Sequence, residues 1–362
     1  MKNRHYGVDL LRILAMLGVC LLHFNSALGL SHIDFTSYPV SRVISSSEHF
    51  MGMCSVNIYA MITGYFCINA SKLRVAKHVQ LWFQVAFYTA GLFLVYYILK
   101  NAFHTELAGC SFVSLLYPLP LASTYWYFAA YTVVFFLAPF LNRGIKALTK
   151  SQLQKMLLFC LVLMPVAAVL RPSFGEYVSL DNAGHSAAWL IIMYITGSYT
   201  RLYPPRFKKQ TIILMIFILL TAMQVIVLFN DKNCAGSTYY YPPYVFMSIA
   251  IMLLFTQFEI KNNYARCLIA WAAPLSFGVY LIHMHPCVFK NLIHFFASFG
   301  EVVNHFWFIT LATSFLYIVC SFIDWVRMKL FSIAHIKELS QLIENKSRNI
   351  LSFLQFKLER WF

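Results

Sequence analysis

Long apolar stretches alternate along this chain with short polar segments that are rich in lysine and arginine. A helix that crosses a bilayer needs about 20 apolar residues. Ten stretches come near or reach this length, and they cover residues 8–28, 49–69, 78–99, 123–141, 153–170, 186–200, 211–229, 239–258, 268–289 and 302–323. The pattern predicts an all-α fold, a polytopic membrane helix bundle with about ten transmembrane helices.

Composition supports lipid as the main solvent of the chain. Hydrophobic residues make up 60% of it and charged residues only 11%, whereas soluble globular domains are about 25% charged. The net charge of +15 would suit nucleic-acid binding if it lay on one face. The basic residues instead form short clusters between apolar stretches, so we expect membrane lipid and no nucleic acid as a partner.

The distribution of basic residues predicts the topology. The N-terminal segment and every second polar segment after it hold 22 of the 28 lysines and arginines. The other loops hold five, namely Arg42, Lys100, Arg171, Lys232 and Lys290, and Arg12 lies within the first predicted helix. Because short basic segments stay in the cytoplasm, both ends of the chain are predicted to be cytoplasmic.

Two regions are expected along the chain. Residues 1–326 form the transmembrane domain, and residues 327–362 form a basic cytoplasmic tail. Leucines and isoleucines recur in this tail between charged residues, which is typical of an amphipathic helix lying on the inner leaflet.

The first predicted helix carries three ionisable side chains, Asp9, Arg12 and His23. At about 100° per residue, Arg12 and His23 project within about 20° of each other, and Asp9 lies within about 60° of Arg12. Since charge inside a membrane is costly, such a stripe is a candidate functional site. His23 lies about 16 Å further out than Arg12, at ~1.5 Å per residue.

This arrangement suits acyl transfer from a thioester donor that enters from the cytoplasm. Arg12 would meet the donor's phosphates, and His23 would accept a proton from an attacking hydroxyl. Two other interpretations stay open: a structural ion pair with a hydrogen-bonded histidine, and a secondary transporter whose relay uses Asp9, Arg12, His23 and His283.

Four segments in order resemble one known family. They are the first helix GVDLLR with ten residues between Arg12 and His23, VNIYAMITGYF, YWYFAAYTVVFFLAPFLN, and LSFGVYLIHMHP. Together they resemble the membrane-bound acyltransferase-3 family of bacterial surface-glycan acylation. The resemblance implies a multi-pass protein of the bacterial inner (plasma) membrane. It would move an acetyl group from acetyl-CoA to a hydroxyl of a cell-surface polysaccharide or its lipid-linked precursor, with no bound cofactor.

The resemblance also implies roles for individual residues. His23 becomes the catalytic histidine and Arg12 its partner in the donor site, while Arg74 and Lys77 take the place of the family's basic pair for acyl-CoA. Lys77 stands where that pair usually has a second arginine, so the bidentate phosphate geometry is lost. The family's serine before Gly-Tyr is Thr63 here, followed by Gly64 and Tyr65.

Three further residues are candidates for the functional site. Each of them also has an ordinary structural explanation. His283 is expected at a depth similar to that of His23, where it would bind acceptor or leaving group, or cap a carbonyl. Glu48 would orient His23 or mark the interface. Trp126 would stack on a sugar ring or belong to an interfacial aromatic belt.

The sequence lacks the motifs that are typical of several other activities. His283 and His285 have no carboxylate or cysteine nearby in sequence, so no metal site is expected. The sequence has no P-loop and no GxSxG elbow, which argues against nucleotide hydrolysis and serine esterase chemistry.

Overall fold

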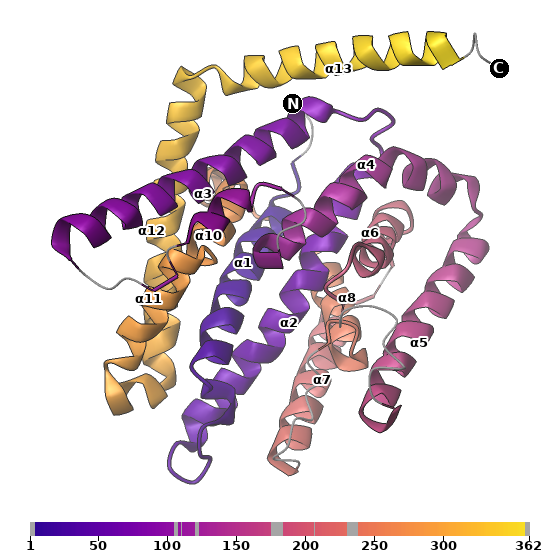
Figure 1. Ribbon diagram of the computed structural model, residues 1–362. Coiled ribbons are helices and arrows are strands. Elements are labelled where there is room, and N and C mark those ends of the chain that lie inside the picture. The colour runs from indigo at the N-terminus through magenta and orange to yellow at the C-terminus, as the bar shows by residue number, and fades with distance from the viewer. Residues whose placement is uncertain are drawn as a thin grey trace.

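A computed structural model describes residues 4–104, 108–109, 111–119, 123–174, 184–205, 207–229 and 238–358. All regular secondary structure in these ranges is helical, which confirms the predicted all-α class (Figure 1). The α-helices are α1 (Tyr6–Ala27), α2 (Pro39–Cys67), α3 (Val75–Phe103), α4 (Trp126–Ala147), α5 (Lys150–Phe174), α6 (Ala187–Leu202), α7 (Lys209–Phe229), α8 (Pro242–Thr256), α9 (Asn263–Ala272), α10 (Ser276–His283), α11 (Pro286–Ala297), α12 (Phe306–Ile333) and α13 (Ile336–Leu358).

The chain is a polytopic helical membrane protein. Within the described ranges, seven helical segments are long and apolar enough to cross a bilayer: α1, α2, α3, α4, α7, the α9–α10 segment and α12. Each of the ten predicted ranges overlaps a helix, but α6 has 16 residues and α8 has 15. Both are shorter than the about 20 residues of a full crossing. The count of ten and the cytoplasmic placement of both ends stay predictions.

The predicted helix over 268–289 is broken in the structure. A 3₁₀ turn, Ala273–Leu275, separates α9 from α10, and α10 ends at His283. Pro286 then starts α11, a separate helix that the apolar pattern did not predict. Proline has no backbone N–H, so it fits at a helix start and disrupts a helix interior. His285 precedes it and caps α11, because its Nδ1 accepts from the backbone N–H of Cys287.

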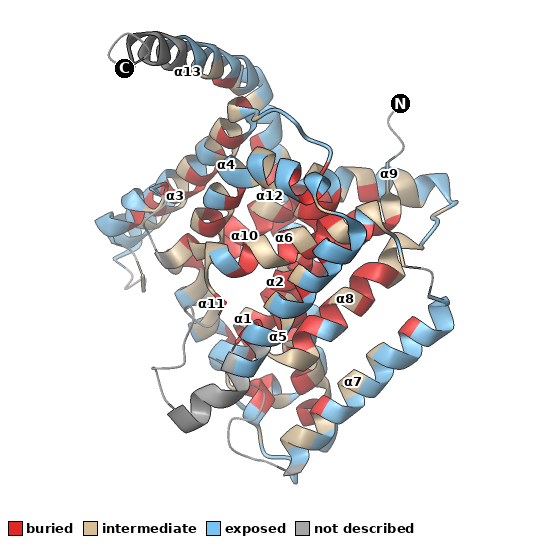
Figure 2. Cartoon of the chain, turned by 90° about the vertical axis from the view of Figure 1, so that its right-hand side faces the viewer, coloured by how far each residue is buried: buried red, intermediate tan, exposed pale blue. Residues whose placement is uncertain are grey.

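Helices α1 and α2 lie at the centre of the bundle (Figure 1). α1 contacts α2, α8, α10 and α12, and α2 also contacts α6. Side chains facing these contacts form the main apolar core. Large apolar side chains on the outer surfaces of α3, α7 and α12 are exposed, as Figure 2 illustrates for α7. Those exposed surfaces match a lipid environment.

Two glycines allow α2 and α6 to approach closely. A Cβ on Gly64 of α2 would collide with the carbonyl oxygen of Tyr194, and one on Gly197 of α6 would collide with that of Met61. Small residues at such crossings let helix backbones pack directly in membranes. The Thr-Gly-Tyr segment of α2 therefore has a packing role at its glycine.

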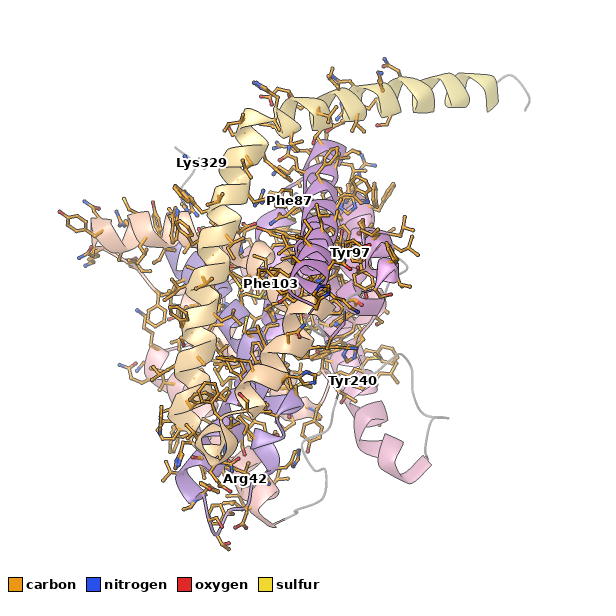
Figure 3. All side chains as sticks on the ribbon, turned by 60° about the vertical axis from the view of Figure 1, so that its left-hand side comes forward. Arg42, Phe87, Tyr97, Phe103, Tyr240 and Lys329 are labelled. Atoms are coloured by element: carbon orange, nitrogen blue, oxygen red, sulfur yellow. The ribbon has the colours of Figure 1, made fainter. Side chains whose placement is uncertain are left out.

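Helix α13 crosses one end of the bundle, the end at which α1 begins (Figure 1). Lys329 lies toward this end and Arg42 at the opposite end (Figure 3). α12 continues past residue 326 to Ile333, so the predicted domain boundary falls inside a helix. Glu344 of α13 accepts a hydrogen bond at 2.8 Å from the backbone N–H of Ala76, in the first turn of α3.

Candidate functional site

Two histidines from distant parts of the sequence meet inside the bundle. His23 lies near the end of α1 and His283 at the end of α10. Their Nδ1 and Nε2 atoms, respectively, are 2.9 Å apart. His283 is fully buried and His23 partly so. The structure thus brings together the predicted catalytic histidine and the histidine that was expected at a similar depth.

The hydrogen bonds around this pair define which nitrogens carry protons. Nδ1 of His283 lies 2.7 Å from the carbonyl oxygen of Val279, to which only a protonated nitrogen donates. In a neutral imidazole the other nitrogen, Nε2, is then an acceptor, and Nδ1–H of His23 donates to it. We therefore assign His23 the tautomer with a free lone pair on Nε2. Such a nitrogen is suited to accept a proton.

Near the start of α1, Asp9 contacts two arginine side chains. Its buried carboxylate is 2.6 Å from Arg4 Nε and 3.4 Å from Arg12 Nη1. The Arg12 guanidinium also lies over the ring of Phe66, 5.5 Å from its centroid. The predicted Asp9–Arg12 pair is present, and Arg4 joins it, a contact that helical spacing did not reveal.

Thr63 and Tyr59 connect α2 to the Arg12 region. The Thr63 hydroxyl donates to the Tyr59 carbonyl at 3.0 Å, and the Tyr59 hydroxyl donates to the Arg12 carbonyl at 2.8 Å. The Thr63 hydroxyl is thus engaged within its own helix.

Tyr65 contacts a second cationic group. Arg201 donates to its hydroxyl at 3.0 Å, and the same guanidinium contacts His5 at 2.8 Å. Partial burial, and then the neighbouring Arg201 cation, lower the pKa of His5 below its usual value. Arg201 was assigned only a topological role from sequence, because helical spacing does not relate α6 to α2.

The proposed acyl-CoA residues Arg74 and Lys77 lie at the start of α3 and are both exposed. Arg74 is the N-cap residue of this helix. Arg12 lies over Phe66 at the end of α2, and α3 begins a few residues after α2 ends. Positive side chains from α1 and α3 therefore lie at the same end of the bundle.

Glu48 does not contact His23. Its carboxylate oxygens accept from Asn25 Nδ2 at 3.0 Å and from the Thr310 hydroxyl at 2.6 Å. It connects α1 to α12 instead, and the orienting position that was expected for it beside His23 is taken by His283.

Trp126 begins α4 and packs in an aromatic cluster. Its ring centroid lies 4.7 Å from that of His185 and 5.7 Å from that of Tyr239, with which it is stacked. His185 and Tyr239 could not be predicted from helical spacing, since both lie in short segments between helices. Tyr280, three residues before His283 in the YLIH segment, was also missed.

A buried charged network links α12 to α3. Asp324 accepts hydrogen bonds from Gln84 at 2.9 Å, from Tyr88 at 2.8 Å and from Arg327. It packs directly against Gly278 of α10. Because all its partners are present, we assign it to bundle assembly. The sequence placed Asp324 just beyond the last predicted span and so missed its burial.

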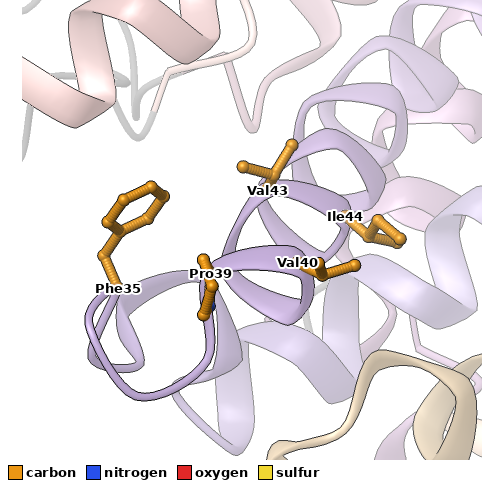
Figure 4. A pocket seen from close by; sticks show the side chains of 5 residues that line it. All are labelled: Phe35, Pro39, Val40, Val43 and Ile44. Carbon is orange, nitrogen blue, oxygen red and sulfur yellow. The ribbon is translucent and has the colours of Figure 1, made fainter.

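The described residues bring together no group of three or more histidine, cysteine, aspartate or glutamate side chains that would hold a metal ion. An open apolar pocket of about 320 Å³ lies at the start of α2 (Figure 4). Its lining residues, Phe35, Pro39, Val40, Val43 and Ile44, offer no ionisable group for catalysis.

Comparison with known proteins identifies the family. The family model described as an acyltransferase domain matches residues 5–325, from the start of α1 into α12. No curated protein and no solved structure matches the chain. The matched range contains the histidine pair and the Asp9–Arg12 pair. This multi-pass membrane protein therefore belongs to the acyltransferase 3 family.

Proposed function

We propose that this protein is an O-acetyltransferase of a bacterial inner membrane. It moves an acetyl group from cytoplasmic acetyl-CoA to a hydroxyl of a cell-surface polysaccharide or its lipid-linked precursor. The observation that carries the proposal is the chain from Val279 through His283 to His23, which leaves a proton-accepting Nε2 inside the bundle.

This geometry supports the following reaction. His23 Nε2 accepts the proton of the acceptor hydroxyl while that oxygen attacks the thioester carbonyl carbon. The carbonyl π electrons move to oxygen, and a tetrahedral intermediate forms. When the carbonyl re-forms, the C–S bond breaks, and the leaving thiolate takes the proton back from His23. His283 acts as a positioning residue that holds the His23 ring and its tautomer.

Basic side chains support the proposed binding of acetyl-CoA. Asp9 holds Arg12, and Arg74 and Lys77 stand exposed at the start of α3. Cations in this position suit the phosphates of coenzyme A. The about 16 Å between Arg12 and His23 along α1, at ~1.5 Å per residue, would be spanned by the pantetheine arm.

A labelling experiment tests this function. Membrane vesicles that expose the cytoplasmic face are supplied with ¹³C-acetyl-CoA, and the glycan and lipid-linked saccharide fractions are analysed by mass spectrometry. We expect labelled O-acetyl groups with the wild-type protein and none with His23→Ala. His294→Ala is the matched control, because His294 is exposed on α11 and should leave transfer intact. Equal labelling with His23→Ala would contradict the proposal.

A further inference from the structure

Tyr280 carries a buried hydroxyl without a partner beside the histidine pair. The residue is 6% exposed, and its hydroxyl forms no hydrogen bond with the described residues. It lies one turn before His283 on α10, and the two rings meet edge to face with centroids 6.2 Å apart. An unmade hydrogen bond at a buried polar group costs about 1–3 kcal/mol. A buried hydroxyl without a hydrogen-bond partner, next to the proposed base, is therefore a candidate to bind the substrate.

The N-terminus of α4 faces the same hydroxyl. α4 begins at Trp126, and its N-cap residue, Tyr125, provides no side-chain cap. The Tyr125 hydroxyl donates instead to the Leu281 carbonyl at 2.8 Å, which fixes this turn against α10. The Tyr280 hydroxyl lies close to the backbone N–H of Tyr127 without bonding to it. The first N–H groups of a helix have no acceptor within the helix and carry the positive end of its dipole.

These donors lie in the same cluster of side chains as the proposed base, His23. His23 and His283 have ring centroids 5.2 Å apart, and Tyr280 follows His283. The Tyr280 hydroxyl lies near that of Tyr239, whose ring is 4.7 Å from His185. Base and hydroxyl donor therefore belong to one local cluster built from α1, α10 and the segments before α6 and α8.

We propose that the Tyr280 hydroxyl and the backbone N–H of Tyr127, at the start of α4, form the oxyanion-binding site of the transfer reaction. The inference rests on the proposed acyltransferase function. As the acceptor oxygen bonds to the thioester carbon, the carbonyl oxygen gains the electron pair of the π bond. Tyr280 donates a hydrogen bond to that oxygen and keeps its proton, and the N–H of Tyr127 supplies a second donor. Both donors return to their initial state when the C–S bond breaks.

The chain contains a matched control for this assignment. Tyr244 on α8 is also buried, and its hydroxyl is likewise without a hydrogen-bond partner in the described structure. Its ring packs against Phe50 and Tyr241, and among the described residues it has no ring contact with His23 or His283. Burial of a lone hydroxyl is thus shared by both tyrosines, whereas contact with His283 is specific to Tyr280.

The test compares Tyr280→Phe with Tyr244→Phe in acetyl transfer, with rates normalised to folded protein. Loss of one oxyanion donor typically lowers kcat by about 10²–10³-fold. We expect a fall of that order in Tyr280→Phe with an unchanged KM for acetyl-CoA, and wild-type kinetics in Tyr244→Phe. Thermal unfolding should give both variants a Tm at or above wild type, because neither loses a hydrogen bond.

Three results would overturn the assignment. A normal kcat in Tyr280→Phe removes the oxyanion role and leaves the proposed function standing. A fall in kcat that is matched by a lower Tm, or by an equal fall in Tyr244→Phe, identifies a structural role. A wild-type protein that transfers no acetyl group to any acceptor overturns the proposed function together with this inference.

Discussion

At the scale of single residues, the site depends on the contact between His23 on α1 and His283 on α10, whose Nδ1 and Nε2 atoms are 2.9 Å apart. Helical periodicity related His23 to Arg12 and Asp9, because all three lie on α1 and their directions follow from about 100° per residue. The same reasoning could not reveal that His283 contacts His23, since periodicity describes one helix and not its neighbours. Glu48 was chosen as a partner on charge alone, and its bonds to Asn25 and Thr310 exclude that position.

The role of His283 leads to a first prediction. Removing the acceptor for His23 Nδ1–H frees the ring to rotate and to change tautomer. In His283→Gln the amide oxygen still accepts this hydrogen bond, whereas His283→Ala offers no acceptor. A neutral hydrogen bond contributes about 0.5–1.5 kcal/mol, so kcat of the Ala variant should fall about three- to tenfold below that of the Gln variant. KM for acetyl-CoA should stay constant. Equal kcat in the two variants would show that the hydrogen bond is not used.

The donor site leads to a second prediction at this scale. Arg12→Ala and Arg74→Ala should each weaken acetyl-CoA binding, measured by calorimetry in detergent. Loss of a charge-assisted hydrogen bond of about 1.5–3 kcal/mol corresponds to a roughly tenfold to hundredfold higher Kd. Arg143→Ala is the control, since Arg143 is an exposed cation of α4 outside the proposed site. Unchanged affinity in both site variants would leave Arg12 and Arg74 as topological residues only.

At the scale of elements, apolar length predicted where helices lie but not how they break or cross. Pro274 and Pro286 divide the predicted helix over 268–289, so the chain turns just after His283. A continuous helix would have given His283 a different set of neighbours. The close approach of α2 and α6 also depends on two glycines that are far apart in sequence and were not connected by any pattern.

A third prediction concerns this crossing. Gly197→Ala places a Cβ against the carbonyl oxygen of Met61, so α6 must move away from α2. Overpacking of this kind costs about 1–3 kcal/mol, and Tm in detergent should fall. In Gly91→Ala on α3 the new Cβ meets no atom within 4 Å, so Tm should stay level or rise. If Gly197→Ala were as stable as Gly91→Ala, the direct backbone contact would be refuted.

At the scale of the whole molecule, composition was sufficient to predict a polytopic α-helical membrane protein. Low charge and long apolar stretches leave helices as the simplest way to satisfy every backbone group in lipid. The alternating basic segments further predict that α13 and the start of α1 share the cytoplasmic side, and the two do lie at the same end of the bundle (Figure 1).

The topology itself is a fourth prediction. Ser37 lies in the exposed segment before α2, and Lys337 is exposed on α13. A membrane-impermeant maleimide added to intact cells should label Ser37→Cys, while Lys337→Cys should react only after the membrane is opened. The unmodified chain, with its exposed Cys267, provides the background. Labelling of Lys337→Cys in intact cells would reverse the predicted orientation.

The central claim is that His23 is the base of a thioester-dependent acyl transfer. Thiol release from acetyl-CoA by purified protein in liposomes, with and without saccharide acceptors, measures this step directly. We expect thiol release that depends on the saccharide acceptor, because His23 takes its proton from the acceptor hydroxyl as that oxygen attacks the thioester. In His23→Ala the release should disappear while the protein stays inserted and folded. Acceptor-dependent release at the wild-type rate in His23→Ala would contradict the account.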